Sequence, residues 1–340
     1  MPGVLVNVTR GPIVESIHRG DLAVVDSAGK LLHQVGDPDR VTYFRSSSKP
    51  IQALAGVLSG AVDRFGLTER ELAVTCASHS AEDFHVEAVL SVLAKAGLGE
   101  QHLQCGWHPP LDRASAARLV EAGRKPTSVH SNCSGKHSGM LAACQAMGWP
   151  TSDYINPDHP LQRWNRELVA TVCDYPAKDI VIGIDGCGVP VFGLPVRNMA
   201  YGFARLADPD TLPSELRTPV RRIVAAMRAY PEMVAGTSRF CSDLMRAAAG
   251  KVVAKSGAEA VYCAGFLKGK TTATAERGMA AAVKIDDGGS RATAPVMMKV
   301  VTGLGILDAA QAAALKRYAH PENRNFRNDL CGEIKVVFEL

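Results

Sequence analysis

The stretch Arg45-Ser46-Ser47-Ser48-Lys49-Pro50 decides how the rest of this chain is interpreted. Ser46 and Lys49 stand three residues apart where a helix is predicted to begin, since Pro50 suits a first turn and apolar residues recur after it at helical spacing. Residues i and i+3 share a helix face, so the two side chains can meet. A lysine that loses solvent can take the proton of a serine hydroxyl, which makes this pair a candidate nucleophile and base.

Ser78 belongs to a second polar stretch. It follows the apolar run Leu72–Val74, which we predict to be a strand, and precedes a helix predicted to begin near Glu82. Side chains at such a junction are often offered to a cleft. Ser80 suits the helix N-cap, which leaves Ser78 and its neighbour His79 as candidates for a site.

The segment Ser131–Gly139 is polar and small-sided, and it leads into an apolar helix. Backbone N–H groups at such a helix entry can bind a carboxylate. The glycines allow close approach of a ligand or a second backbone, and the order of residues is not that of a phosphate loop. A capped turn is the alternative structural interpretation of this segment.

Cys133 and Lys136 from that segment have a counterpart in Asp185-Gly186-Cys187-Gly188, which follows a predicted strand at 180–184. A carboxylate at a strand end can hold a charged substrate group. Thiolates suit zinc, but an amine ligand is uncommon and the spacing matches no standard zinc finger. Spacing alone therefore gives only weak support for a metal site.

Lys255-Ser256-Gly257 is the last of these motifs and precedes a predicted strand. Penicillin-binding proteins and serine β-lactamases carry Ser-x-x-Lys first and Lys-Ser/Thr-Gly last among their site elements. Ser46, Ser78 and Lys255 follow the same chain order, so the motifs are more informative together than singly.

Composition excludes several classes of protein. The chain has 340 residues, 46% hydrophobic and 21% charged, with a net charge of +4 and no run of basic residues, which gives no indication of nucleic-acid or membrane-surface binding. No apolar stretch approaches the roughly 20 residues that span a bilayer, and the first ten residues lack a signal-peptide core. The 9 cysteines include no C-x-x-C pair. We expect reduced thiols in a soluble, cytoplasmic protein.

The apolar pattern predicts an α/β fold. Strands are expected near both chain ends and helices between them, which favours an antiparallel sheet built from N- and C-terminal strands and flanked by helices. We expect a single integrated domain over residues 1–340, with a mostly helical central region at about 46–250. Helices are expected at 51–62, 82–96, 114–122, 134–147, 160–173, 218–230, 242–249, 295–302 and 309–318, and strands at 4–8, 13–17, 22–25, 31–35, 180–184, 260–267, 279–285 and 334–338.

Taken together, the motifs resemble the class 3, rhizobial-type L-asparaginases. The resemblance spans nearly the whole chain and implies a serine β-lactamase and penicillin-binding-protein fold. The segments that carry it are Val14–Gly20, Arg45–Pro50, Ala77–Ser80, Asn132–His137, Asp185–Gly188 and Lys255–Glu259.

The resemblance also implies roles for individual residues. Ser46 would be the nucleophile and Lys49 its base, with Ser78 and Lys255 as a second Ser–Lys pair. Zinc would be the cofactor, and a homodimer is expected. The zinc ligands would be Cys133, Lys136 and Cys187 with a water, and the residues around substrate and metal would be Arg45, His137 and Asp185.

The expected activity is hydrolysis of L-asparagine to L-aspartate and ammonia through an acyl-enzyme. The alternatives are a β-lactam or peptide-amide hydrolase of the same fold, and a non-catalytic, zinc-dependent amino-acid-binding protein. A hydrolase that uses Cys133 is disfavoured, because a thiolate bound to zinc is not free to attack. The sequence leaves open which serine is acylated, what zinc does, and whether asparagine or glutamine is preferred.

Overall fold

The structure is a computed structural model that describes residues 1–340. The chain forms two compact units, and each is built from separate chain segments. Unit 1 consists of Met1–Ser47, Leu194–Thr211 and Asp243–Leu340, and unit 2 consists of Ser48–Gly193 and Leu212–Ser242. Three elements contain a boundary between the units: η1 (Arg45–Ser48), β6 (Pro190–Pro195) and α12 (Phe240–Ala247). The single integrated domain stays a prediction.

Unit 1 is an antiparallel sheet with helices. Its strands are β1 (Gly3–Arg10), β2 (Ile13–Asp26), β3 (Leu31–Val35), β4 (Val41–Tyr43), β7 (Val252–Gly257), β8 (Val261–Phe266), β9 (Met279–Ile285), β10 (Glu322–Arg324) and β11 (Leu330–Val336). Its helices are α9 (Val196–Ala207), η5 (Pro209–Thr211), η6 (Ser290–Ala292), α13 (Thr293–Gly303), α14 (Ala309–Ala314) and α15 (Lys316–Ala319).

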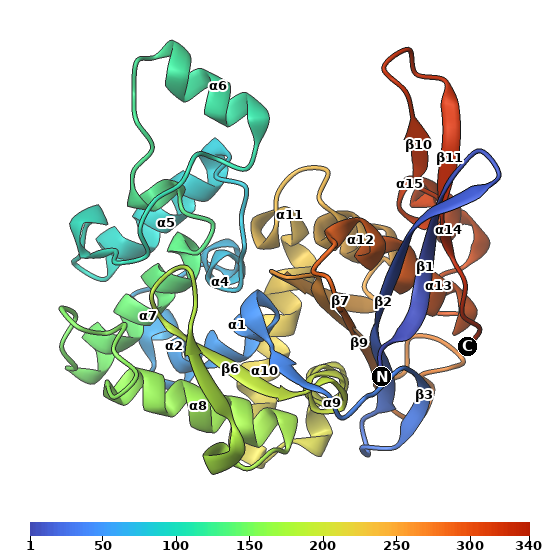
Figure 1. Cartoon of the computed structure of the whole chain (residues 1–340). Coiled ribbons are helices and arrows are strands. Elements are labelled where there is room, and N and C mark those ends of the chain that lie inside the picture. The colour runs from blue at the N-terminus through green and yellow to red at the C-terminus, as the bar shows by residue number, and fades with distance from the viewer. The chain divides into compact units, whose positions relative to one another are not determined.

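The large sheet has eight strands in the order β10-β11-β1-β2-β9-β8-β7, and β3 pairs with β2. The strands from the two chain ends are neighbours, because β1 pairs antiparallel with β11 and Val6 lies opposite Val336 (blue and red in Figure 1). The prediction of an antiparallel sheet from N- and C-terminal strands, with helices packed on it, is therefore confirmed.

The core of unit 1 lies around β8 and β9, in which every residue is buried. Successive side chains of a strand point to opposite faces, so both faces of the sheet are covered there. Helices α9 and α13 both contact these two strands. A Cβ on Gly265 would lie 2.6 Å from the carbonyl oxygen of Phe203, so the glycine is what lets α9 pack this closely.

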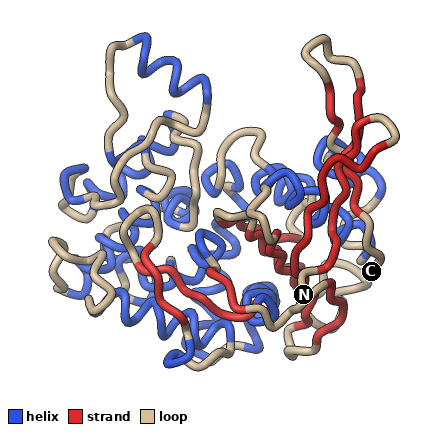
Figure 2. Tube along the Cα trace, viewed as in Figure 1, coloured by secondary structure: helices blue, strands red, loops and turns tan.

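Unit 2 is mainly helical, and β5 (Val181–Ile184) and β6 are its two adjacent strands (Figure 2). Its helices are α1 (Lys49–Gln52), α2 (Leu54–Leu58), α3 (Ala61–Arg64), α4 (Glu69–Thr75), α5 (Asp83–Lys95), η2 (Glu100–His102), α6 (Arg113–Glu121), η3 (Ser128–His130), α7 (Ser134–Met147), α8 (Pro160–Cys173), η4 (Ala177–Asp179), α10 (Ser214–Ala229) and α11 (Pro231–Val234).

Helix α7 is the centre of unit 2. All residues from Ser134 to Cys144 are buried, and the helix contacts α2, α3, α4, α5 and α8. A helix that is buried all round belongs to a core rather than to a surface. The polar side chains at its start are thus carried into the interior of the unit.

Several predicted elements differ from the structure. Leu72–Val74 lies in helix α4 and not in a strand, because Thr68 and Glu71 form a capping box that starts a helix at Glu69. The helix expected at 51–62 is divided into α1, α2 and α3, and Gly60 between α2 and α3 has a φ of +75°. The strands expected at 13–17 and 22–25 form one continuous strand, β2.

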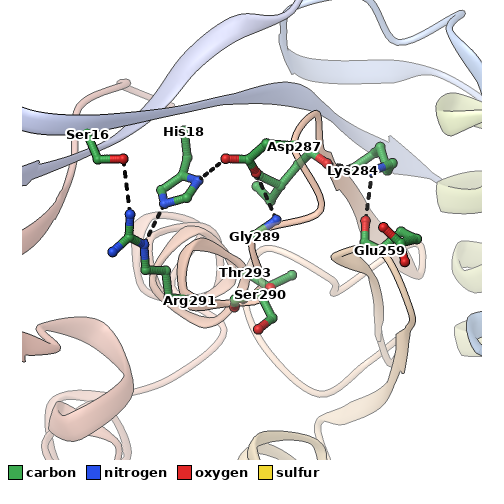
Figure 3. A network of polar contacts seen from close by, with 10 residues as sticks. Ser16, His18, Glu259, Lys284, Asp287, Gly289, Ser290, Arg291 and Thr293 are labelled. Atoms are coloured by element: carbon green, nitrogen blue, oxygen red, sulfur yellow. Dashed lines mark hydrogen bonds and ion pairs between the residues drawn. The ribbon is translucent and has the colours of Figure 1, made fainter.

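The segment Val14–Gly20 lies in β2 and has a structural role that the sequence did not reveal (Figure 3). Its His18 is buried, with Nδ1 2.7 Å from Asp287 Oδ2 and Nε2 accepting from Arg291 Nε at 2.7 Å. Arg291 also donates to Ser16 Oγ at 3.0 Å. These contacts tie β2 to the loop before α13.

None of the helices combines the length and the apolar character that crossing a membrane requires. All nine cysteines are free thiols, and all except Cys331 are buried.

Candidate functional site

Helices α4 and α7 cross closely, and this crossing positions Ser78. A Cβ on Gly135 would lie 2.2 Å from the carbonyl oxygen of Val74, and one on Gly139 would lie 2.8 Å from Thr75 Cγ2. Atoms cannot approach this closely without displacement, so only glycine at both positions admits the end of α4. The close approach expected at these glycines is made by α4, through its backbone at Gly135 and through the Thr75 side chain at Gly139. It brings the chain just after α4 next to the start of α7.

Lys49 is buried and its amine lies among acceptors from both of these segments. Nζ lies 2.6 Å from the carbonyl oxygen of Ala77, 3.0 Å from Ser78 Oγ and 3.2 Å from Cys133 Sγ. A fourth acceptor, the carbonyl oxygen of Asn132, lies farther from Nζ, at 3.5 Å. Unit 2 therefore brings Lys49 and Ser78 into direct contact.

Cys133, Lys136 and Cys187, which the resemblance implies as zinc ligands, also lie close together in unit 2. Lys136 Nζ lies 3.1 Å from Cys187 Sγ. A hydrogen bond from Cys187 holds the pKa of Cys133 well below 9.0, against the effect of burial and with help from the charges of Lys49 and Lys136. The same hydrogen bond, followed by burial, raises the pKa of Cys187. The hydrogen bond between the two sulfur atoms thus favours negative charge on Cys133.

The pKa of Lys136 is shifted in the opposite direction from that of an isolated buried amine. Burial acts to lower the pKa of Lys136, but the negative charge of the Cys133–Cys187 pair, together with that of Asp185, raises it above 10.5. The ammonium form of Lys136 therefore neutralises negative charge in this cluster.

Cys187 and Asp185 reach the cluster through the turn between β5 and β6. Ile184 pairs with Pro190, so the residues between them form the loop. The loop is closed by bonds from the Asp185 N–H to the carbonyl oxygen of Val189 and from the Gly188 N–H to the carbonyl oxygen of Asp185, both 2.9 Å. Gly188 has a φ of +87°, which glycine adopts without the strain that a side chain adds.

His79 holds the Ser78 segment against the start of α7. Its Nδ1 accepts from the Ala81 N–H at 3.1 Å, so Nε2 carries the proton and donates to Ser134 Oγ at 2.9 Å. Ser134 Oγ then donates to the carbonyl oxygen of Val129 at 2.8 Å. Burial lowers the pKa of His79 well below 6.5, which agrees with a neutral ring. His79, left as a candidate by the sequence, positions the segment through these bonds.

His137 lies on α7 and is fully buried. Its Nδ1 lies 2.7 Å from the hydroxyl of Tyr154. Burial, and then the charges of Lys136 and Lys49, lower the pKa of His137 well below 6.5. Sequence reasoning missed Tyr154, which lies in the loop between α7 and α8. No motif surrounds Tyr154, and no signal in the sequence identifies it.

A second group of predicted residues meets in unit 1. Ser47 Oγ donates to the carbonyl oxygen of Lys255 at 3.0 Å, so η1, which contains Arg45 and Ser46, lies beside β7. Lys255 lies within β7 rather than before a strand, and its buried Nζ donates to the carbonyl oxygen of Ser256 at 2.8 Å. Arg45 has a φ of +49°, a left-handed conformation that costs a non-glycine residue energy.

The structure thus brings the predicted site residues together in two groups. The unit 1 group is Arg45, Ser46 and Lys255, and the unit 2 group is Lys49, Ser78, Cys133, Lys136, His137, Asp185 and Cys187. No cluster of three or more His, Cys, Asp or Glu side chains suited to a metal occurs in the chain. Cys133 and Cys187 nevertheless offer two sulfur atoms beside the Lys136 nitrogen, a donor set compatible with a soft or borderline ion such as zinc.

Comparison with known proteins gives one family match, over residues 6–336, to L-asparaginase II. No curated protein matches the chain. The chain is similar to a probable glutaminase from Bacillus subtilis complexed with 6-diazo-5-oxo-L-norleucine, with 13% identity, a TM-score of 0.38, and 85% of this chain and 84% of that chain covered. A second structure of a Bacillus subtilis probable glutaminase has 12% identity, a TM-score of 0.41, and coverage of 85% and 89%.

The structure of Mglu in its glutamate form has 16% identity to the chain and a TM-score of 0.38, with 88% of this chain and 65% of that chain covered. At such identities and TM-scores, these three similarities carry no argument about the site. The family match is of a different kind because it spans nearly all of the sequence, from β1 to the end of β11. The chain belongs to the L-asparaginase II family.

Proposed function

We propose that the protein hydrolyses the side-chain amide of L-asparagine to L-aspartate and ammonia, through an acyl-enzyme on a serine served by Lys49. The contact of 3.0 Å between Lys49 Nζ and Ser78 Oγ carries the proposal, because a Ser–Lys pair with a buried amine is a nucleophile next to its base. Membership of the L-asparaginase II family supports an amidohydrolase.

The proposed reaction has two similar halves. Lys49, once neutral, takes the serine proton as the oxygen attacks the amide carbon, and the resulting oxyanion needs hydrogen-bond donors. Collapse of this intermediate breaks the C–N bond, and the proton held by Lys49 goes to the departing ammonia. Water then attacks the ester in the same way and releases L-aspartate.

Two serines compete for the role of nucleophile. The resemblance assigns it to Ser46, with Ser78 and Lys255 as a second pair, and this assignment stays a prediction. The contact with Lys49 favours Ser78 as the serine from which the lysine directly accepts a proton. The experiment below separates the two assignments.

The groups around the substrate are proposed from their charge. The Asp185 carboxylate would pair with the substrate ammonium, and Arg45 with its carboxylate, as charge-assisted hydrogen bonds. Cys133, Lys136 and Cys187 would hold zinc, which, when bound, supplies a Lewis acid for polarising an oxygen. The chain's own part is to keep Cys133, Lys136 and Cys187 in one buried cluster.

The test is ammonia release from L-asparagine and L-glutamine by the purified protein and by Ser46→Ala and Ser78→Ala variants. The nucleophile is identified by mass spectrometry after exposure to 6-diazo-5-oxo-L-norleucine, since a diazoketone alkylates the attacking oxygen. Loss of the label with one variant only identifies that serine. Ser59→Ala is the matched control, because its hydroxyl contacts only nearby backbone: it donates to the carbonyl oxygen of Gly56 at 3.2 Å and accepts from the Ala61 N–H at 3.3 Å.

Failure to release ammonia from either amide would overturn the proposal. Turnover of the β-lactam nitrocefin would then indicate a β-lactam hydrolase. Calorimetric binding of asparagine or aspartate without turnover would indicate an amino-acid-binding protein.

A further inference from the structure

Tyr154 and His137 form a buried pair in unit 2 whose hydrogen bonds determine where the imidazole proton lies. The Tyr154 side chain is 0% exposed. Its hydroxyl oxygen accepts from the Gln104 N–H at 2.9 Å, and its backbone carbonyl oxygen accepts from Gln162 Nε2 at 2.7 Å. Bonds at both ends of the residue hold the hydroxyl 2.7 Å from His137 Nδ1.

Proton counting decides the direction of the Tyr154–His137 bond. A backbone N–H can only donate, so Gln104 supplies the proton in its bond and Tyr154 keeps its own. The Tyr154 proton has one partner within reach, His137 Nδ1. If His137 Nδ1 carried a proton instead, the buried Tyr154 proton would have no acceptor, which is costly. Tyr154 therefore donates to Nδ1, and the ring of His137 carries its proton on Nε2.

The second observation concerns the other ring nitrogen of His137, Nε2. It is buried and has no hydrogen-bond partner in the structure. A buried polar group without a partner needs an explanation, and an absent ligand is one of the few. The charges of Lys49 and Lys136 both act on this ring, so it belongs to the same cluster as the proposed base.

We propose that Tyr154 is a positioning residue that fixes His137 as the Nε2–H tautomer, and that this N–H donates to a carboxylate or amide oxygen of the bound substrate. The proposal rests on the proposed function for the identity of that substrate. It also means that His137 is not a metal ligand. A histidine that binds a metal through Nε2 has its proton on Nδ1 and donates from there, whereas here Nδ1 is the acceptor.

The test is a double-mutant cycle of His137 and Tyr154, in which the side-chain amide of glutamine or asparagine replaces one nitrogen of the histidine ring. The amide nitrogen of glutamine approximates Nε2 of histidine, and that of asparagine approximates Nδ1. His137→Gln should keep a donor at the Nε2 position without help from Tyr154, whereas His137→Asn should lose it. Tyr154→Phe alone frees the ring to adopt either tautomer. Tyr175→Phe, at the half-buried tyrosine after α8, is the matched control.

We expect Tyr154→Phe and His137→Asn to raise the KM for L-asparagine and the Ki for L-aspartate by about tenfold or more. In the His137→Gln background, Tyr154→Phe should add less than about a twofold change, since the two residues act through one bond. Bound metal per chain should be equal in all variants. An equal loss from Tyr154→Phe in both backgrounds would indicate a merely structural tyrosine and overturn the proposal.

Nitrogen-15 NMR of histidine-labelled protein tests the tautomer without any activity. The His137 signal is assigned by its absence from His137→Gln. It should show Nε2 protonated in the wild type and a mixture of tautomers in Tyr154→Phe. A wild-type ring protonated on Nδ1 would overturn the proposal, even in an active enzyme. Absence of ammonia release with the Nε2–H tautomer present would refute the proposed function alone.

Discussion

Lys49 has neighbours of three kinds, a carbonyl oxygen, a hydroxyl and a sulfur atom, and the proposed chemistry requires it to exchange a proton with one of them. Lys49→Arg keeps the positive charge, but a guanidinium group does not give up its proton in proteins. We expect kcat for ammonia release to fall by about 10²–10⁴-fold, the usual contribution of a general base. Steady-state kinetics with L-asparagine measures this change.

The control for this prediction is Lys178→Arg, at an exposed lysine in η4. It should leave kcat unchanged, because the same substitution is made in the same unit away from the cluster. A Lys49→Arg variant with kcat within a few-fold of the wild type would remove Lys49 as the base. The charge of the residue would then be what matters.

At the scale of elements, the crossing of α4 and α7 links fold and chemistry. Gly135→Ala would place a Cβ 2.2 Å from the carbonyl oxygen of Val74, and backbone cannot move aside as a flexible side chain can. We expect a loss of about 1–3 kcal/mol in the free energy of unfolding. We also expect a lower kcat, because the displaced α4 carries the Ser78 segment with it. Urea denaturation and ammonia release measure the two effects.

Gly56→Ala is the matched control, since the nearest atom to its added Cβ is the carbonyl oxygen of Gly139 at 3.9 Å. In helix α2 this substitution should stabilise by up to about 1 kcal/mol. If Gly135→Ala behaved like Gly56→Ala, the close crossing would not position Ser78.

Glu71 stabilises the start of helix α4, and its contribution to the free energy of unfolding depends on pH. Burial acts to raise the pKa of Glu71, but hydrogen bonds from Lys95, Ser91 and Thr68 hold it below 4.5. A lowered pKa in the folded state contributes stability above the unfolded pKa, and this is lost as the pH falls through the folded value. Glu71→Gln should therefore destabilise by about 1–3 kcal/mol at pH 7, and by less at a pH below both values.

Urea unfolding at pH 7 and at low pH, with Glu87→Gln as an exposed control on α5, measures this difference. A deficit for Glu71→Gln that is the same at both values would show that the charge of Glu71 contributes nothing.

The sequence predicted those elements whose signals are local. Helices α7 and α8 occur at the predicted bounds, because α7 ends at Gly148, which has a φ of +67°, and α8 has Pro160 in its first turn. Helix α4 was predicted as a strand because a short apolar run has no distinct period, although the Thr68–Glu71 capping box was present. Helix α9 was not predicted, even though Val196, Met199, Ala200 and Phe203 have helical spacing.

Only those residues of the candidate site that lie in sequence motifs were predicted. Ser78, Cys133, Lys136 and Cys187 were named from the sequence, and unit 2 brings them to Lys49 or to one another. The sequence did not reveal that the carbonyl oxygen of Ala77 contacts Lys49 or that Tyr154 contacts His137, because the positions of these partners depend on tertiary packing. Such partners have no signature in a single sequence.

In the molecule as a whole, each unit brings together segments that are far apart in the sequence. The two ends of the chain pair as β1 and β11 in unit 1, while the proposed metal ligands come from the N-cap and first turn of α7 and from the β5–β6 turn in unit 2. Folding therefore has to close long loops before either arrangement exists, which costs chain entropy. In unit 2, a ligand that binds two such segments together would offset part of this loss of chain entropy.

A metal held by Cys133, Lys136 and Cys187 would be such a ligand. It binds the folded arrangement and not the separated segments, so zinc added to chelator-treated protein at a hundredfold excess over its Kd should stabilise by about 2.7 kcal/mol. The free energy of unfolding in urea, with and without zinc, measures this increment. Cys187→Ser should abolish it. Cys144→Ser, at a buried thiol on α7 outside the cluster, should keep it whatever its own cost in stability. An equal increment in Cys187→Ser, or none in the wild type, would remove the metal from this cluster and leave the Lys136 ammonium as the group that neutralises the cysteine pair.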